Sequence, residues 1–207
     1  MKLTRIALLA GFTLISSCSI LPKPEPFEVY RLPSAQSASA SHGTPQRWSL
    51  RLTKFQASDV LKSPNIAVIP QGDVISSYKG SRWSDPAPVL LRNRLLDGFQ
   101  QDGRVPLLST DDSIFQTDLE LGGHLQAFQT EYQGTTATVV VSLDALLVRS
   151  YDQHILASRR FEVRQPLSDV KVPAVVAGFG QASDQLTAQV VNWAVEQGQK
   201  VELPARP

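Results

Sequence analysis

The feature that most limits the fold of this chain is a succession of three apolar segments with strand periodicity, followed by one long segment with helical periodicity. In the first segment, leucines alternate with polar residues, so one face of the expected strand is apolar. In the last, large apolar side chains form a single stripe, which is typical of an amphipathic helix packed on a sheet. These segments cover residues 119–128, 138–148, 155–163 and about 173–197. The helical stripe consists of Val175, Phe179, Leu186, Val190 and Trp193.

The N-terminal half adds shorter strands and a second helix. Strands are expected at 48–53, 66–69 and 74–78, with an additional first strand at 27–32. Ser84-Asp85-Pro86 is typical of a helix start, because a capping side chain precedes a proline whose missing N–H costs nothing there. Gly103 is placed to end this leucine-rich helix. A turn is expected at Gln133-Gly134.

The order of these elements indicates the fold class. Strands and helices follow one another as β-β-β-α-β-β-β-α. This order predicts an α/β fold of the α+β type, with a mixed or antiparallel sheet of about six strands. Two main helices are expected to pack on the sheet, on one face of it.

The single cysteine, Cys18, follows a short apolar run near the N-terminus. Lys2 and Arg5 precede the run, and Ile15-Ser16-Ser17 stand directly before the cysteine. A positive segment, an apolar segment and small residues are typical of a signal peptide, here 1–17. Residues 15–18 resemble a bacterial lipobox, so Cys18 is expected to carry the lipid. An ordinary signal peptide with a chance cysteine and a short membrane anchor are the alternatives, although the run is too short to span a bilayer.

The remaining organisation follows from composition. Residues 18–46 comprise the cysteine, a spacer with prolines at 22, 24 and 26, and a Ser/Ala-rich flexible loop at 33–46. We expect the folded domain at 47–200 and a C-terminal tail at 201–207. The chain has 20 Lys and Arg against 19 Asp and Glu, and two of the basic residues lie in the leader. This balance argues against nucleic acid as a partner and against a polybasic membrane contact.

The search for reactive groups gives no active site. The three histidines, His42, His124 and His154, do not have the spacing of metal ligands, and the cysteine is expected to be lipidated. His124 with Glu120 or Glu131 is a weak acid–base candidate. Asp111-Asp112 indicates a solvated turn rather than a calcium loop. No nucleotide-binding loop or nucleophile elbow is present. We therefore expect no metal, no cofactor and no enzymatic activity.

Two segments remain as candidates for partner binding. Arg82-Trp83 is expected in a loop before the first long helix, where Trp83 either covers the helix start or contacts a partner. The connection at 168–172 joins the sheet to the last helix and is either a contact surface or a simple link.

The assembled pattern resembles the family of ABC-type transport auxiliary lipoproteins (PqiC/YmbA-like). The resemblance rests on the lipobox, the strand at Tyr30-Arg31-Leu32 and the order of the later strands and closing helix. Its most specific local feature is Arg82-Trp83, followed by Ser84-Asp85-Pro86.

The resemblance implies a non-enzymatic lipoprotein subunit of an MCE-type ABC transport system that moves lipids or other hydrophobic molecules across the envelope. The implied partners are an MCE-domain periplasmic protein and the permease and ATPase of the same system. Association of several copies of the chain is left open. Ser19 after Cys18 resembles the sorting pattern for the outer membrane, facing the periplasm. The alternative is an envelope scaffold or regulator of cell-wall synthesis or outer-membrane assembly.

Overall fold

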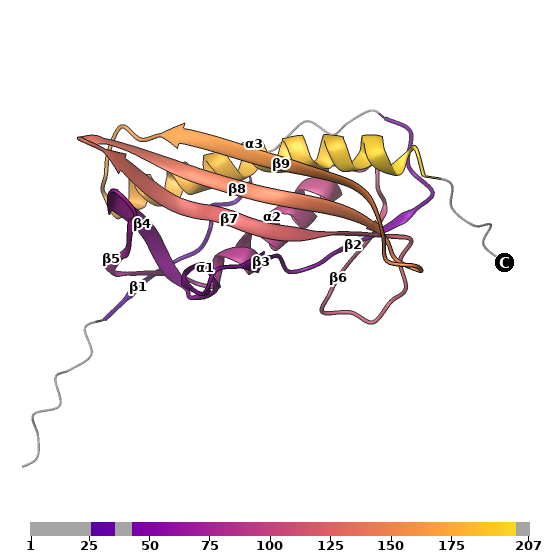
Figure 1. Cartoon of the computed structure of the whole chain (residues 1–207), viewed down its shortest axis with the longest axis horizontal. Coiled ribbons are helices and arrows are strands. Elements are labelled where there is room, and N and C mark those ends of the chain that lie inside the picture. The colour runs from indigo at the N-terminus through magenta and orange to yellow at the C-terminus, as the bar shows by residue number, and fades with distance from the viewer. Residues whose placement is uncertain (1–25, 36–42, 202–207) are drawn as a thin grey trace, which may run out of the picture.

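The computed structural model describes residues 26–35 and 43–201, so the predicted signal peptide, Cys18 and His42 lie outside the described residues. The strands are β1 Glu28–Tyr30, β2 Ser49–Leu52, β3 Gln56–Ala57, β4 Asn65–Gln71, β5 Val74–Trp83, β6 Leu107–Thr110, β7 Leu119–Gln133, β8 Thr136–Arg149 and β9 His154–Pro166. The helices are α1 Asp59–Lys62, α2 Ala87–Asp102 and α3 Val172–Gly198. Figure 1 shows the long strands lying across the two long helices.

Strand β7 organises the sheet. One of its edges pairs with β8 in antiparallel register from Leu119↔Arg149 to Gln133↔Thr136, and β8 pairs in the same way with β9. The tight turn between β7 and β8 contains Gly134 at φ 63°, a left-handed conformation that glycine adopts without strain. The predicted turn and the three predicted long strands are therefore confirmed, and each strand is longer than its apolar segment.

The other edge of β7 is shared by three short strands. β2, β3 and β4 pair with it in parallel and in succession, through Leu50↔Leu119, Gln56↔His124 and Ala67↔Gln129. Beyond them, β6 pairs with β2, and β5 and β1 follow β4. The sheet is thus mixed, as predicted. Within the described residues it has nine strands rather than about six, because several short strands pair with the fifteen-residue β7.

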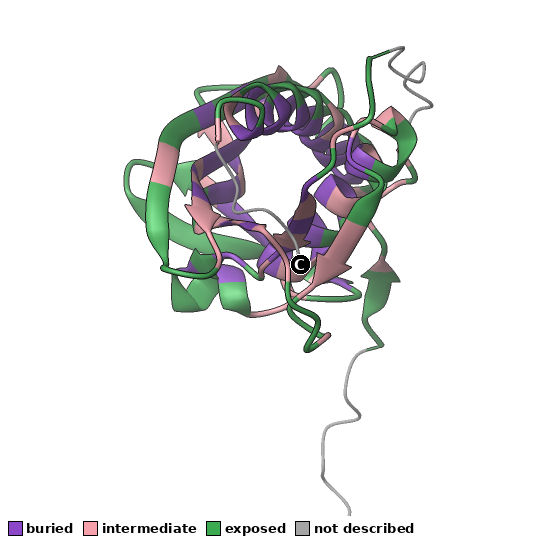
Figure 2. Ribbon diagram, turned by 90° about the vertical axis from the view of Figure 1, so that its right-hand side faces the viewer, coloured by how far each residue is buried: buried purple, intermediate pink, exposed green. Residues whose placement is uncertain are grey.

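The sheet curls around the two long helices, which lie on the same face as predicted. Figure 2 shows the buried residues turned toward the inside of this curl and the exposed residues outside. β7 carries an irregularity between Leu125 and Ala127, and bulges of this kind increase the local twist of a sheet. Gly123, at φ 133°, lies against the backbone of Asp144, where a Cβ would overlap the carbonyl. A glycine is therefore required at this point of the curl.

Helix α2 begins near the predicted position but without the predicted cap. Pro86 is the N-cap residue, and its ring has no atom that could cap the helix. Ser84, two residues earlier, donates from Oγ to Asp85 Oδ2 at 2.9 Å. The C-terminal end is as predicted. Gly103 is left-handed at φ 75°, and its N–H donates to the Phe99 carbonyl at 3.1 Å.

The core lies between the inner face of the sheet and the helices α2 and α3. All five residues of the predicted stripe on α3 are buried. Burial of each such large apolar side chain contributes roughly 1.5–3 kcal/mol to stability. Trp83, Phe128 and Phe179 form an aromatic cluster at its centre, with ring centroids 4.7–5.9 Å apart. The sheet and the closing helix are thus joined by side chains from β5, β7 and α3.

Candidate functional site

Arg82 and Trp83, the residues predicted to bind a partner, do not lie in a loop. They are the last two residues of β5, which extends five residues beyond the predicted strand. Only 1% of Trp83 is exposed, and its ring packs edge-on against Phe128 and Phe179. The prediction that Trp83 contributes to a docking surface is therefore corrected, because its side chain is part of the core.

Arg82 points to the other side of the strand and is exposed. Its guanidinium lies 5.6 Å from the centroid of the Phe27 ring, in cation–π range. β1 pairs beside it in parallel, through Val29↔Arg82, and Val29 is also exposed. The predicted first strand is thus confirmed, and Arg82 remains a prediction for partner binding.

The connection between β9 and α3 is exposed from residue 168 to residue 171. Its conformation is fixed locally, since the Lys171 N–H donates to Asp169 Oδ1 at 3.0 Å and the Leu167 N–H donates to the Ala137 carbonyl at 2.9 Å. Val170 presents an apolar side chain to solvent. The segment 168–172 also stays a prediction for partner binding.

The acid–base candidate around His124 is not assembled. Glu120 pairs with Arg51 at 3.3 Å, and Glu131 pairs with Arg164 at 2.6 Å. His124 is exposed on β7, where its cross-strand neighbour is Asp144. Among residues 26–35 and 43–201, no group of three or more His, Cys, Asp or Glu residues is arranged to hold a metal ion.

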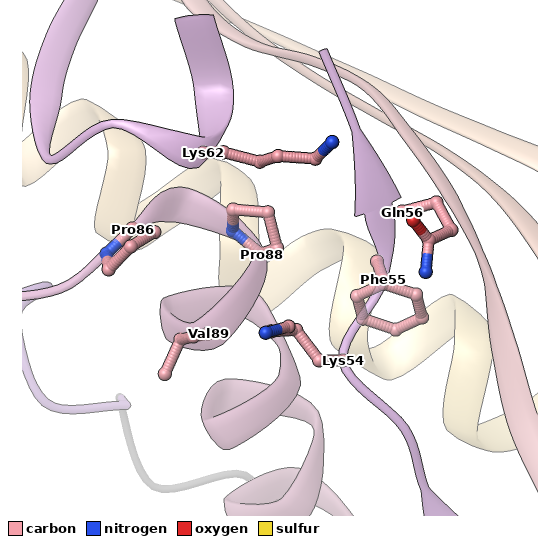
Figure 3. A pocket seen from close by; sticks show the side chains of 7 residues that line it. All are labelled: Lys54, Phe55, Gln56, Lys62, Pro86, Pro88 and Val89. Atoms are coloured by element: carbon pink, nitrogen blue, oxygen red, sulfur yellow. The ribbon is translucent and has the colours of Figure 1, made fainter. Parts of the chain in front are cut away.

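A cavity of about 310 Å³ lies where α1, the start of α2 and the β2–β3 connection meet. Phe55 is buried at its base, and the ammonium-bearing chains of Lys54 and Lys62 enter from different elements (Figure 3). The lining residues are Lys54, Phe55, Gln56, Lys62, Pro86, Pro88 and Val89. An apolar base with cationic groups at the edge is suited to binding an apolar group that carries negative charge. Sequence reasoning missed this cavity, because its walls come from two segments about thirty residues apart.

The segment after β6 is fixed by a nearly buried arginine. The side chain of Arg92, on α2, is 8% exposed, and its Nη1 lies 2.5 Å from Asp111 Oδ1 and 2.9 Å from Asp112 Oδ2. The Lys54 N–H also donates to Asp111 Oδ2 at 3.0 Å. Partial burial raises the pKa of Asp111, but the Lys54 N–H and the Arg92 guanidinium outweigh it and leave the pKa below its ordinary value. The predicted solvated turn is confirmed, since both aspartates are exposed in a turn, and their contacts with Arg92 join this turn to α2.

A second nearly buried arginine on α2 connects the N-terminal segment to the body. The side chain of Arg94, 4% exposed, forms an ion pair with Asp184 of α3 and donates to the Pro33 carbonyl. Pro33 also packs against Gly180, where a Cβ would lie 3.2 Å from the proline ring. Pro33, which was predicted to begin a flexible loop, is therefore held against α2 and α3.

None of the helices within residues 26–35 and 43–201 combines the length and the apolar character needed to cross a bilayer.

Comparison with known proteins identifies the family. The family model for the ABC-type transport auxiliary lipoprotein component matches residues 30–191, which extend from β1 into the last helix. Protein XCC0632 from Xanthomonas campestris, a solved structure of the DUF330 family, is 30% identical in sequence. It superposes with a TM-score of 0.77 over 84% of this chain and 97% of its own. Another solved structure, of an uncharacterized protein, is 18% identical with a TM-score of 0.63 over 82% of this chain and 99% of its own, and it shows the same fold.

A curated relative, the uncharacterized protein bll6063 of Bradyrhizobium diazoefficiens, is 27% identical over 165 residues. The match covers 79% of this chain and 41% of that protein, so this chain spans about two fifths of the relative's length. The family model covers β2 to β9, helix α2 and most of α3, and the structural match with XCC0632 covers 84% of this chain. The chain therefore belongs to the family of ABC-type transport auxiliary lipoprotein components.

Proposed function

We propose that this chain is the outer-membrane-anchored lipoprotein subunit of an MCE-type ABC transport system that moves lipids or other hydrophobic molecules across the envelope. The observation that carries the proposal is the family match, which covers the domain from β1 into α3. An auxiliary component of an ABC transport system has its partners in the transporter. The proposal is finer than the family match in three respects: the MCE-domain partner, the lipid cargo and the outer membrane. The resemblance found in the sequence supports these three points.

In this proposal the subunit acts by docking rather than by catalysis. The energy source is a separate ATPase, and the chain contributes a folded domain held near the membrane. The lipid on Cys18 provides the anchor, and the proline-rich spacer provides reach. Because acidic and basic residues are nearly balanced, the acyl chains rather than a basic surface would attach the protein to the membrane.

The anchoring claim is tested by separating inner and outer membranes on a density gradient. The wild-type chain should appear in the outer-membrane fractions, because Ser19 follows Cys18. The Cys18→Ala variant should leave these fractions or stay uncleaved. Recovery of Cys18→Ala as a mature outer-membrane protein would contradict lipid anchoring, and a wild-type peak in the inner membrane would contradict the destination.

The transport claim is tested by comparing gene deletions. Strains that lack this chain, the MCE-domain protein or both should show the same sensitivity to detergents and hydrophobic antibiotics. The double deletion should be no more sensitive than either single deletion, since both remove one system. Additive sensitivity would place the two proteins in different systems. A phenotype equal to that of a cell-wall synthase deletion would favour a scaffold or regulatory function.

A further inference from the structure

Two large apolar side chains in the connection between β6 and β7 are turned toward solvent. Ile114 is 98% exposed and Phe115 is 68% exposed. Burying such side chains contributes roughly 1.5–3 kcal/mol each, and the fold does not obtain this stabilisation from either of them. Adjacent exposed apolar residues of this size are typical of a contact surface when the backbone that carries them is held in place.

The backbone of this segment, residues 111–115, is held on both sides. Arg51 of β2 donates through Nη2 to the Phe115 carbonyl, and the Ser113 N–H donates to the Thr110 carbonyl at 3.1 Å. At the start of the segment, Arg92 pairs with both carboxylates. The loop backbone is therefore partly ordered in the free protein, so binding a partner costs less conformational entropy. We call residues 111–115 the docking loop.

The docking loop lies at the end of the molecule opposite to β1, where the described chain begins (Figure 1). The turn between β8 and β9 lies at the same end, where the Ser150 N–H donates to the carbonyl of Asp118, three residues after the docking loop, at 2.9 Å. Tyr151 in this turn and Ile155 at the start of β9 add exposed apolar side chains to the same end. A tether that enters next to β1 would direct this end away from the anchoring membrane.

The charge of the docking loop indicates the chemistry of its partner. Asp111 and Asp112 precede the apolar pair in the sequence, and the guanidinium that they share, from Arg92, is nearly buried. The second guanidinium at the loop, from Arg51, is balanced by Glu120 at 3.3 Å. The two aspartates against Arg92 therefore leave an acidic excess, which disfavours contact with an anionic lipid surface. An apolar pocket of a protein with a basic group at its edge satisfies both features.

We propose that the docking loop inserts Ile114 and Phe115 into an apolar, basic-edged pocket of the periplasmic transporter component. This inference deepens the proposed function and rests on it for the identity of the partner. The geometry of the loop, with exposed apolar side chains on a fixed backbone, is independent of that identity.

The test uses the full-length lipoprotein in detergent-solubilised envelopes, captured through a tagged MCE-domain protein. The Ile114→Ser/Phe115→Ser double variant should be captured about tenfold less than wild type or lower, as for loss of interface hot spots. Its matched control is Val74→Ser/Ile75→Ser, which removes another adjacent exposed apolar pair, at the start of β5. Capture of the control should equal that of wild type, and all variants should keep the wild-type thermal midpoint because the replaced residues are exposed. Wild-type capture of the Ile114→Ser/Phe115→Ser variant would overturn the proposal.

A photo-crosslinking residue, p-benzoylphenylalanine, at position 115 separates this inference from the proposed function. The expected product in intact cells is an adduct with the MCE-domain protein, absent when the crosslinker stands at position 74. If the MCE-domain protein captures no wild-type lipoprotein, the proposed function fails. The crosslinked product then tests separately whether the docking loop binds a protein. One identified protein crosslinked at 115 and not at 74 would retain the loop as a docking surface. No adduct, a lipid adduct, an adduct with a second copy of this chain or equal adducts at both positions would overturn it.

Discussion

Gly98 of α2 and Thr187 of α3 face each other where the two long helices cross, and a Cβ built on Gly98 would overlap Thr187 Cγ2. Glycine in a helix interior costs about 1 kcal/mol relative to alanine, so its presence here reflects the close approach of the helices. The same two helices are joined nearby by Arg94 and Asp184. The contact between α2 and α3 is therefore a defined part of the core.

The Gly98→Ala variant is expected to lose about 1 kcal/mol of unfolding free energy. Overpacking costs about 1–3 kcal/mol, and the better helix propensity of alanine offsets about 1 kcal/mol of it. Urea denaturation measures the difference. Adding Thr187→Ser, which removes the overlapping Cγ2, should restore stability. A single Gly98→Ala variant more stable than wild type would show that the helices are not in close contact.

Shortening the side chain of Leu186 in the closing helix should be strongly destabilising. Leu186 is fully buried, so Leu186→Ala is expected to cost about 2–5 kcal/mol through lost apolar burial and the cavity left behind. The control is Gln189→Ala on the exposed side of the same helix. Thermal denaturation should show a large decrease in midpoint for the first variant and little change for the second. Equal midpoints would mean that α3 is not packed as described.

The N-terminal segment should loosen when Arg94 is replaced. Arg94→Met keeps an unbranched side chain but removes the ion pair with Asp184 and the hydrogen bond to the Pro33 carbonyl. Hydrogen exchange of residues 28–32 is expected to accelerate relative to the strands β7 and β8. Arg31→Met, a change at an exposed arginine of the same segment, is the control. Unchanged exchange in Arg94→Met would show that β1 is held without this contact.

The lowered pKa of Asp111 predicts part of the acid sensitivity of the fold. A carboxyl group whose pKa is lower in the folded state stabilises the protein at pH values above its pKa in the unfolded state, which is about 3.9. This contribution disappears as the pH falls through the pKa of the folded state. Asp111→Asn should therefore reduce stability at pH 7. It should also reduce the further loss of stability on acidification from about pH 5 to pH 3. Identical pH dependence in the variant and wild type would contradict the ionic contacts assigned to Asp111.

The sequence predicts the parts of the fold that repeat a pattern over many residues. The long strands and α3 have enough turns of alternation or helical period to be recognised, and Gly134 marks their tightest turn. β3, with two residues, and β6, with four, are too short to show a period. They exist because β7 and β2 offer free edges, which depends on contacts between distant segments.

The candidate sites were harder to predict, and the reasons differ between them. Trp83 was expected in a loop because the predicted strand ended at residue 78. Gly80 is left-handed at φ 66°, and β5 continues through it with Ser81 and Trp83 both facing the core. The cavity next to Phe55 requires the tertiary fold. Ile114-Phe115 was not among the predicted sites, because its role depends on the way Arg51 and Arg92 hold the backbone of this segment.

The most direct test of the central claim is to identify the proteins that the intact lipoprotein contacts in the cell. The full-length chain, tagged after residue 207, is crosslinked in intact cells, solubilised, captured and analysed by quantitative mass spectrometry against an untagged strain. We expect an MCE-domain periplasmic protein, with the permease and ATPase of its system, to be the most enriched partners. Their absence, together with enrichment of a cell-wall synthase or an outer-membrane assembly component, would contradict the account.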